Sequence, residues 1–246
     1  MLGYPDSAVK LADEALAWSR GRGHAFDVGW VLHFLIIFLF HHRREPERCG
    51  PLLDEFERLA REQRLFFYEQ VMAPLCRALL FLQLGRAQEA DAEFQLAIPR
   101  WREAGMGSSL PLFKTWHAEA AGLLRQFDKG LGLVEEALEQ IHRVGWEERL
   151  SLPETLRIKA WLLQSRGDIE EAELCFRDAI NIARKQQAKS WELRATTSYA
   201  QLLRDQNRHS EGLGLLKPIY NWFTEGFDTK DLIEAKALLD ELKVRA

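Results

Sequence analysis

The sequence contains few β-branched residues. Its 246 residues include 7 Val, 10 Ile and 6 Thr, against 39 Leu and 27 Ala, and this balance favours helices over strands. With only 16 Gly and 8 Pro, the chain also has few of the turn residues that a β-sandwich needs. A hydrophobic content of 47% excludes a disordered chain and is enough for a sizeable core. We therefore expect an all-α protein.

Cysteine, net charge and long apolar runs are scarce as well. The three cysteines, Cys49, Cys76 and Cys175, form no Cys-x-x-Cys pair, which argues against a disulfide framework or a zinc site and favours reduced thiols in a cytoplasmic protein. The net charge of −4 gives no general attraction for nucleic acid. We expect no signal peptide at the start of the chain. The longest apolar run, residues 28–40, covers 13 residues, which predicts that it does not span a membrane.

The sequence also lacks the motifs of common enzymes. It contains no G-x-x-x-x-G-K-[ST] loop to hold a triphosphate, no Gly-x-Ser-x-Gly and no His-Glu-x-x-His. None of the seven histidines has another histidine four residues away, so no metal-binding pair on one helix face is predicted. We expect no catalytic activity, no metal and no cofactor in this chain.

What the sequence does contain is a repeat of about 41 residues. Each unit begins at a predicted turn residue, continues with a short polar stretch, and has a small residue five positions later. The turn residues are Gly3, Arg44, Gly85, Arg125, Gly167 and Asn207, and the small residues are Ala8, Cys49, Ala90, Gly130, Ala172 and Gly212. Successive turn residues are 41, 41, 40, 42 and 40 positions apart, and such a fixed period indicates a repeat architecture.

The residues of the unit predict a helical hairpin. A Gly or Asn after a helix can adopt the left-handed conformation that closes its last turn, and a small residue early in the next helix lets two helices approach closely. Because one hairpin cannot bury both of its faces, successive hairpins must stack into a solenoid. We expect a single domain, residues 1–246, with a partial first repeat (1–23), five repeats (24–64, 65–107, 108–147, 148–188 and 189–226) and a C-terminal capping helix (229–244).

One repeat resembles the tetratricopeptide repeat. The small, large, Gly-Asp, Ala, aromatic and Ala positions of that motif are filled by Ala160, Trp161, Gly167, Asp168, Ala172, Phe176 and Ala179. The resemblance implies a right-handed superhelical solenoid of helical hairpins. The period departs from the family, because it is about 41 residues instead of 34, which implies longer helices or longer turns. HEAT-like helix pairs share this period but not the Gly-x-x-x-x-Ala turn, and they are the alternative fold.

The C-terminal third resembles one group of bacterial proteins. Residues 188–195, 202–206, 220–229 and 234–239 are similar to the C-terminal repeat region of large bacterial signalling proteins, and the similarity extends to residues 2–6. In that family an adenylate/guanylate cyclase-like or winged-helix domain precedes a predicted ATPase, and helical repeats follow. The resemblance implies a regulatory region whose parent is a nucleotide cyclase or an ATPase. Because Gly3 occupies a turn, we expect the first helix of its unit to be missing, as in an excised fragment or a stand-alone remnant.

The repeat also predicts where a partner binds. In tetratricopeptide arrays the first helix of each hairpin lines the concave surface, and the residues that fall on this face are Phe34, Phe38, Glu119, Arg157, Trp161, Arg194, Gln201 and Arg204. Aromatic side chains beside Arg and Gln suit an extended peptide or a partner helix. The predicted function is therefore a non-catalytic protein-interaction or sensor module. The alternative is a domain that binds a small-molecule effector in an apolar groove; an open inner surface favours the peptide and a closed pocket the small ligand.

Residues 26–40 are apolar nearly all round. Such a helix is normally buried on several sides, so we expect a central helix of the solenoid. Alternatively, one face with Trp30, Phe34 and Phe38 lines a partner groove or a homodimer interface formed by the apolar N-terminal helices.

Overall fold

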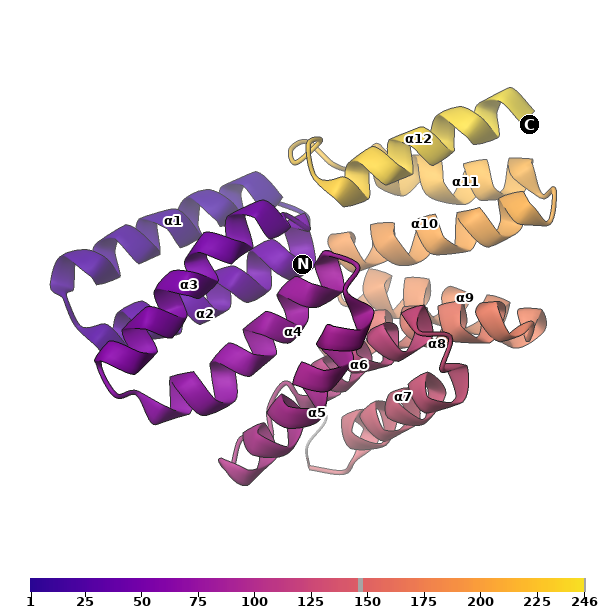
Figure 1. Cartoon of the computed structure of the whole chain (residues 1–246). Coiled ribbons are helices and arrows are strands. Elements are labelled where there is room, and N and C mark those ends of the chain that lie inside the picture. The colour runs from indigo at the N-terminus through magenta and orange to yellow at the C-terminus, as the bar shows by residue number, and fades with distance from the viewer. Residues whose placement is uncertain (146–147, 246) are drawn as a thin grey trace.

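The computed structural model describes residues 1–145 and 148–245, and these residues form helices and turns without a strand (Figure 1). The expected all-α fold is therefore confirmed. The helices are α1 (Pro5–Arg22), α2 (Ala25–Phe38), α3 (Pro46–Glu62), α4 (Ala73–Gln83), α5 (Ala87–Glu103), α6 (Leu110–Leu123), α7 (Phe127–His142), α8 (Leu152–Arg166), α9 (Ile169–Lys185), α10 (Lys189–Asp205), α11 (His209–Tyr220) and α12 (Lys230–Arg245). Two π-helical segments, η1 (Leu39–Arg43) and η2 (Tyr68–Met72), follow α2 and precede α4.

Residues in the left-handed backbone conformation join the helices. All six predicted turn residues have a positive φ, from 58° at Arg44 to 104° at Gly167. A second set, which the sequence did not indicate, consists of Gly23, Arg64, Gly105, Gly145, Gln187 and Gly226, with φ from 53° to 81°. The two sets alternate along the chain, so that each repeat contains two helices and two turns. The predicted boundary between residues 147 and 148 touches residues outside those described.

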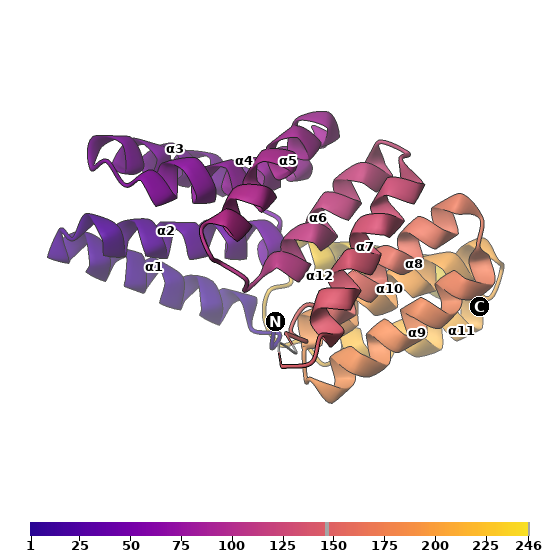
Figure 2. The ribbon, with the colours of Figure 1, turned by 90° about the horizontal axis from the view of Figure 1, so that it is seen from below.

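The helices form two layers that follow the chain order. Each helix contacts the next one, and pairs of even-numbered helices are also in contact: α2 with α4, α6 with α8, α8 with α10 and α10 with α12. The even-numbered helices therefore form an inner layer, and the odd-numbered helices pack outside it. Figures 1 and 2 show the hairpins succeeding one another around the molecule, from α1 through α6 and α7 to α12. The layers are joined by buried faces such as Ala172, Phe176 and Ala179 on α9.

The first and last parts of the chain meet. The backbone N–H of Ser190 donates a hydrogen bond to the Met1 carbonyl oxygen (3.0 Å), and the N–H of Gly226 donates one to Asp6 Oδ2 (2.8 Å). Gly226 has a φ of 76°, and a Cβ there would lie 2.1 Å from Cγ of Pro5. Glycine is therefore required at this position, both for the backbone conformation and for the close approach.

Arg43, the last residue of η1, links these two parts. Its side chain is only 7% exposed, and its guanidinium donates hydrogen bonds to Asp6 (2.7 Å), Asp228 (2.8 Å) and Glu45 (2.5 Å). One cation thus joins the N-terminal segment, the first inner helix and the loop before α12. We call the contact of residues 1–7 and 39–44 with residues 189–194 and 222–234 the closure.

Helix α12 packs against α10 and α11, and its residues overlap the segment 229–244 that we expected to be helical. Its buried residues, Leu232, Leu239 and Leu242 among them, belong to one hydrophobic cluster with residues of α10 and α11. Other side chains of α12 take part in the closure, as described below.

The predicted apolar segment forms α2 and η1, which together make one helix, Ala25–Arg43. This helix has 19 residues and is longer than the 13-residue apolar run. By length and composition alone it could cross a membrane, but half of its most apolar stretch is buried inside the protein. Its exposed side carries a stripe of Phe26, Trp30 and Phe34. The expectation of a central helix therefore describes one side of α2, and the homodimer interface stays a prediction for the other side.

Candidate functional site

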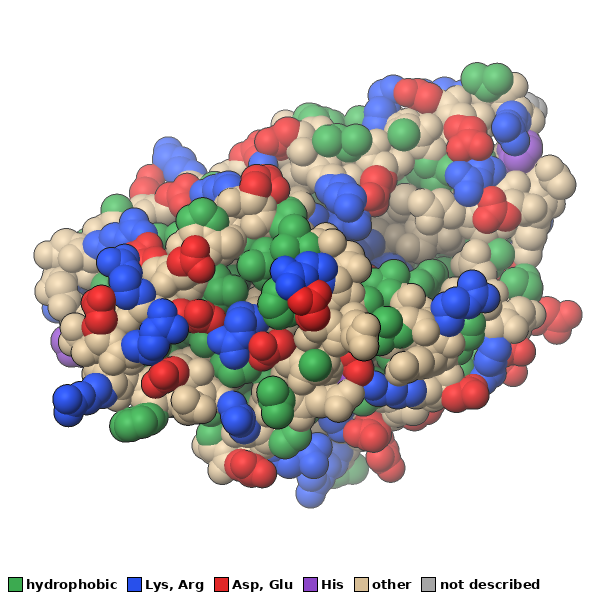
Figure 3. Space-filling view, in the orientation of Figure 1, with side chains coloured by type: hydrophobic (Ala, Val, Ile, Leu, Met, Phe, Trp, Pro, Cys, Tyr) green, Lys and Arg blue, Asp and Glu red, His purple; other side chains and the backbone are tan. Residues whose placement is uncertain are grey.

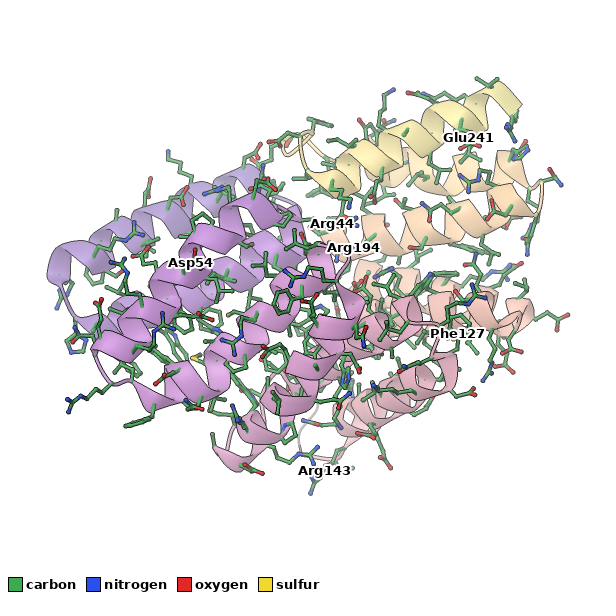
Figure 4. The ribbon with its side chains drawn as sticks, in the orientation of Figure 1. Arg44, Asp54, Phe127, Arg143, Arg194 and Glu241 are labelled. Atoms are coloured by element: carbon green, nitrogen blue, oxygen red, sulfur yellow. The ribbon has the colours of Figure 1, made fainter. Side chains whose placement is uncertain are left out.

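The inner helices and the closure surround a cavity of about 400 Å³, which we call the central cavity. Its lining residues are Phe40, His41, Arg44, Leu82, Gln83, Gly85, Glu119, Leu123, Glu154, Arg157, Trp161, Arg194, Thr197, Ser198, Gln201, Lys230, Asp231 and Glu234. Figure 3 shows a hollow between α12 and the α4 side of the molecule, and Figure 4 places Arg44 and Arg194 beside each other at the junction of the two sides.

Arg194 of α10 joins three elements in the cavity wall. Its guanidinium donates hydrogen bonds to Asp231 Oδ2 on α12 (2.6 Å), to Glu154 Oε1 on α8 (3.3 Å) and to the carbonyl oxygen of His41 (2.5 Å). Arg44 donates from the other side to Asp231 Oδ1 (3.2 Å) and to a further carboxylate on α12. Cationic and anionic side chains therefore alternate in the wall, and they come from the N-terminal part (Arg44) and the C-terminal part (Arg194 and Asp231) of the chain.

Glu154 is a deeply buried carboxylate of this wall, with 1% of its surface exposed. It accepts two hydrogen bonds from Arg157 (2.8 and 2.9 Å) and one from Arg194. Burial alone would raise the pKa of Glu154, but the charges and hydrogen bonds of the two arginines outweigh it and lower the pKa to about 2. Glu154 is therefore ionised at neutral pH and holds both guanidinium groups in place.

His41 fills the centre of the inner layer. The indole Nε1 of Trp116 on α6 donates a hydrogen bond to His41 Nδ1 (3.0 Å), and the ring of Trp191 on α10 lies 4.6 Å from the imidazole, centroid to centroid. Burial, together with the charge of Arg194, lowers the pKa of His41 well below its ordinary value, so the imidazole is neutral. Because η1, α6 and α10 meet here, the inner surface forms a partly enclosed cavity that is still open to solvent on one side.

Three residues of the wall occupy the same position in successive repeats. Glu119, Trp161 and Gln201 each lie six residues before the left-handed turn residue of their hairpin. Gly122 allows the Trp161 ring to lie directly on α6, since a Cβ at Gly122 would be 2.4 Å from Trp161 Cζ3. Stacking of the inner helices therefore converts one repeat position into a row of a carboxyl group, an indole and an amide.

The structure brings five of the eight predicted groove residues together. The five that line the central cavity are Glu119, Arg157, Trp161, Arg194 and Gln201. Arg204 does not line it, because its guanidinium is held by Asp205 and by Glu241 on α12. Its position in the last turn of α10 places it beside the capping helix instead.

Phe34 and Phe38 also lie away from the cavity. Phe34 is 52% exposed on α2, and the Phe38 ring contacts the ring of His42 at 5.6 Å. The π-helical segment η1 has a wider turn than an α-helix, so it rotates the preceding residues of α2 relative to the turn at Arg44. Phe40 of η1 lines the cavity in their place. The cavity therefore keeps an aromatic and apolar part, formed by Phe40, Leu82, Leu123 and Trp161, but not by the predicted Phe34 and Phe38.

Sequence reasoning missed the residues that the closure supplies. His41, Arg44, Asp231 and Glu234 come from opposite ends of the chain, and no repeat position links them. Glu154 could have been found, because Glu154 and Arg194 both lie 13 residues before the turn residue of their hairpins.

No protein-family model matches the sequence, and no curated protein matches it. Among solved structures, the crystal structure of BtubC (BKLC) from P. vanneervenii is similar in fold. The similarity covers 98% of this chain and 90% of the BtubC chain, with a TM-score of 0.56 and 18% sequence identity. At this identity the similarity shows the fold alone, and it shows that the helical architecture is shared over nearly the whole of both chains.

The charges of the cavity wall balance. Four cationic side chains, Arg44, Arg157, Arg194 and Lys230, face four carboxyl groups, Glu119, Glu154, Asp231 and Glu234. Within the described ranges, no three His, Cys, Asp or Glu side chains are grouped so that they could hold a metal ion. The wall therefore offers hydrogen-bond donors, acceptors and an indole face for the recognition of a polar molecule.

Proposed function

We propose that this chain is a non-catalytic sensor module whose central cavity binds a small polar ligand. The observation that carries the proposal is the partly enclosed central cavity, beside which η1, α6 and α10 meet at His41 and the closure joins the two ends. An extended peptide or a partner helix needs an open groove. The cavity volume of about 400 Å³ falls in the range of small-molecule sites, about 300–1,000 Å³.

The charged and polar residues of the wall favour a polar ligand, whereas the alternative predicted from the sequence was a small-molecule effector in an apolar groove. Arg157 Nη1, Lys230 Nζ, the amide of Gln201 and the indole Nε1 of Trp161 all belong to lining residues. Arg157 and Trp161 are partly buried, so a ligand without matching acceptors leaves their donors without hydrogen-bond partners, and this discriminates against such a ligand.

We also propose that the array is a right-handed superhelical solenoid of tetratricopeptide-like hairpins, with α12 as its cap. The period of about 41 residues, the left-handed turn followed by a small residue, and the layer of even-numbered helices support this. HEAT-like pairs are less well supported because they lack that turn.

The resemblance of the C-terminal third to large bacterial signalling proteins supports a regulatory role. We propose that the module is the repeat region of a larger cytoplasmic ATPase or nucleotide cyclase, whose activity follows the occupancy of the cavity. Because both ends of the chain contribute to the wall, a bound ligand can alter the closure and so be sensed by a neighbouring domain or protein partner.

A screen of small polar compounds by ligand-observed NMR tests the site. Compounds that bind the wild-type chain should bind Arg157→Met roughly tenfold or more weakly, since a charged hydrogen-bond donor is lost. Arg102→Met, an exposed arginine of α5 outside the cavity, is the matched control. The proposal fails if no compound binds, or if binding is unchanged in both Arg157→Met and Gln201→Ala.

A further inference from the structure

We infer that the ligand of the central cavity carries a protonated amine, which lies between the carboxylate of Glu119 and the indole ring of Trp161. The inference rests on the proposed function, because it names the chemical class of ligand for the same site. Three observations support it: the unpaired carboxyl group of Glu119, the position of the Trp161 ring, and the existing carboxylate partners of the cavity's arginines.

Glu119 differs from the other carboxyl groups of the cavity. In the described part of the chain, Glu154, Asp231 and Glu234 each accept a hydrogen bond from an arginine. Glu119 lines the same cavity but forms no hydrogen bond or ion pair with the described residues. An ionised carboxylate in such a wall is unfavourable unless a donor or a cation pairs with it. A ligand can supply that cation.

The Trp161 ring lies next to Glu119. Its Cζ3 and Cη2 atoms rest on Gly122, where a Cβ would be 2.4 and 2.7 Å away. Glu119 and Gly122 are three residues apart and therefore lie on one face of α6. Among the described residues, no Lys or Arg side chain stacks over the Trp161 ring. An uncovered indole face attracts a cation, and tryptophan does so most strongly of the aromatic side chains.

The arginines of the cavity already have carboxylate partners, and this disfavours an anionic ligand. Arg157 is bound to Glu154, Arg194 to Asp231 and Glu154, and Arg44 to Asp231 and Glu234. An anion has to compete with these carboxylates for the same guanidinium groups, and Lys230, the remaining cation of the wall, is an exposed residue that water solvates. A protonated amine meets the opposite situation at Glu119, where the acceptor is unoccupied by any protein donor.

Protonation of Glu119 makes the binding of an amine depend on pH. The charged groups that face Glu119 are Arg157 and Glu154 on α8, Arg194 on α10 and Arg44 after η1. Burial raises the pKa of Glu119, against the charges of the three arginines and in the same direction as the charge of Glu154. Because an amine replaces the proton on Glu119, its affinity should increase as the pH rises through the Glu119 pKa, and binding should release a proton.

Titration calorimetry and indole ¹⁵N NMR with n-butylammonium, tetramethylammonium and butyrate test the inference. Both cations should bind and shift the indole resonance that disappears in Trp161→Leu. Glu119→Gln should weaken n-butylammonium binding roughly tenfold or more and abolish its pH dependence. Trp161→Leu should weaken it about threefold to thirtyfold. The control is Glu170→Gln, at an exposed carboxyl group of α9, which should leave binding unchanged.

The melting temperature of Glu119→Gln checks that the variant folds. It should rise at neutral pH, because a carboxyl group whose pKa is raised by folding destabilises the folded state above that pKa. Binding of butyrate alone, or cation binding that Glu119→Gln leaves unchanged, would overturn the inference while the proposed function stands. Failure of every compound in the polar screen would instead overturn the proposed function.

Discussion

Glu119 and Glu154 face the same cavity, yet their pKa values shift in opposite directions. Burial acts on both groups and favours the protonated form of each. Glu154 accepts hydrogen bonds from Arg157 and Arg194, which stabilise its charge. Glu119 interacts with the charges of the same arginines but accepts no hydrogen bond from them. The charges of Arg157 and Arg194, together with their hydrogen bonds, therefore outweigh burial at Glu154, whereas burial outweighs the arginine charges at Glu119. One carboxylate fixes the wall, and the other is available to a ligand.

The depressed pKa of Glu154 predicts a loss of stability in acid. Its folded value of about 2 lies below the ordinary 4.5, so its contribution is present above pH 4.5 and is lost as the pH falls towards 2. The shift corresponds to about 3 kcal/mol. Urea unfolding at pH 6 and at pH 2.5 should show the difference in stability between the wild-type chain and Glu154→Gln shrinking by most of that amount. A difference that is the same at both pH values would contradict this role.

Part of the candidate site follows from the sequence at the level of single residues. Glu119, Trp161 and Gln201 share one repeat position, and this is why they could be placed on the inner surface. The role of Glu154 required the additional knowledge that Arg194 approaches it from α10. His41 could not be predicted, because its contacts with Trp116 and Trp191 join helices far apart in the sequence.

At the level of the helices, the left-handed turns set the spacing of the array. They alternate about every 20 residues, and glycine fills only some of them, since Arg44, Arg125 and Asn207 also have positive φ. A non-glycine residue in this conformation is strained by about 1–2 kcal/mol. The protein therefore already contains backbone strain at the turns without glycine. Replacing a glycine at one of the other turns should add strain of the same size.

Gly167→Ala should destabilise the protein by about 1–2 kcal/mol. Gly167 has a φ of 104° and no atom within 4 Å of an added Cβ, so the cost comes from the backbone alone. The matched substitution is Gly132→Ala in α7, where an added Cβ also meets nothing. It should stabilise the protein by up to about 1 kcal/mol, because alanine is the better helix former. Chemical denaturation of both variants measures the two effects, and equal signs would refute this account of the turns.

The repeat predicted one set of turns and missed the other for a physical reason. Each turn residue of the first set is followed by a small residue five positions later, and this constant spacing made the set visible. The second set has no such spacing signal, and it contains Arg64 and Gln187, residue types that do not indicate a left-handed turn. The π-helical segment η1 could not be predicted from the sequence either, because no residue type is diagnostic of a π-helix. Its wider turn is what moved Phe34 and Phe38 away from the cavity.

For the whole molecule, the closure is the decisive feature. It brings residues 1–7 and 39–44 against residues 189–194 and 222–234, and it supplies Arg44, Asp231 and Glu234 to the cavity wall. Contacts between residues so far apart in the sequence do not follow the repeat period, and the repeat therefore does not predict them. The all-α class could therefore be predicted from composition, but the central cavity could not.

Arg43→Ala should open the closure. The side chain is buried and holds Asp6, Glu45 and Asp228, so its removal should cost about 1–3 kcal/mol and increase the radius of gyration measured by X-ray scattering. Arg20→Ala is the control, because Arg20 forms a half-exposed ion pair with Glu55 between α1 and α3, outside the closure. An unchanged radius of gyration in Arg43→Ala would show that the ends stay together without this cation.

The closure also fixes the number of units in the array. In an open solenoid a repeat can be added or lost, because each unit contacts only its neighbours. Here Arg43 reaches Asp228 across 185 residues, and it can do so only if the hairpins between them turn the chain through the required angle. Duplication or deletion of one hairpin would move the two residues apart and dismantle the cavity. A protein with this closure therefore cannot vary the number of its hairpins, as other repeat proteins do, and related proteins must differ by substitutions instead.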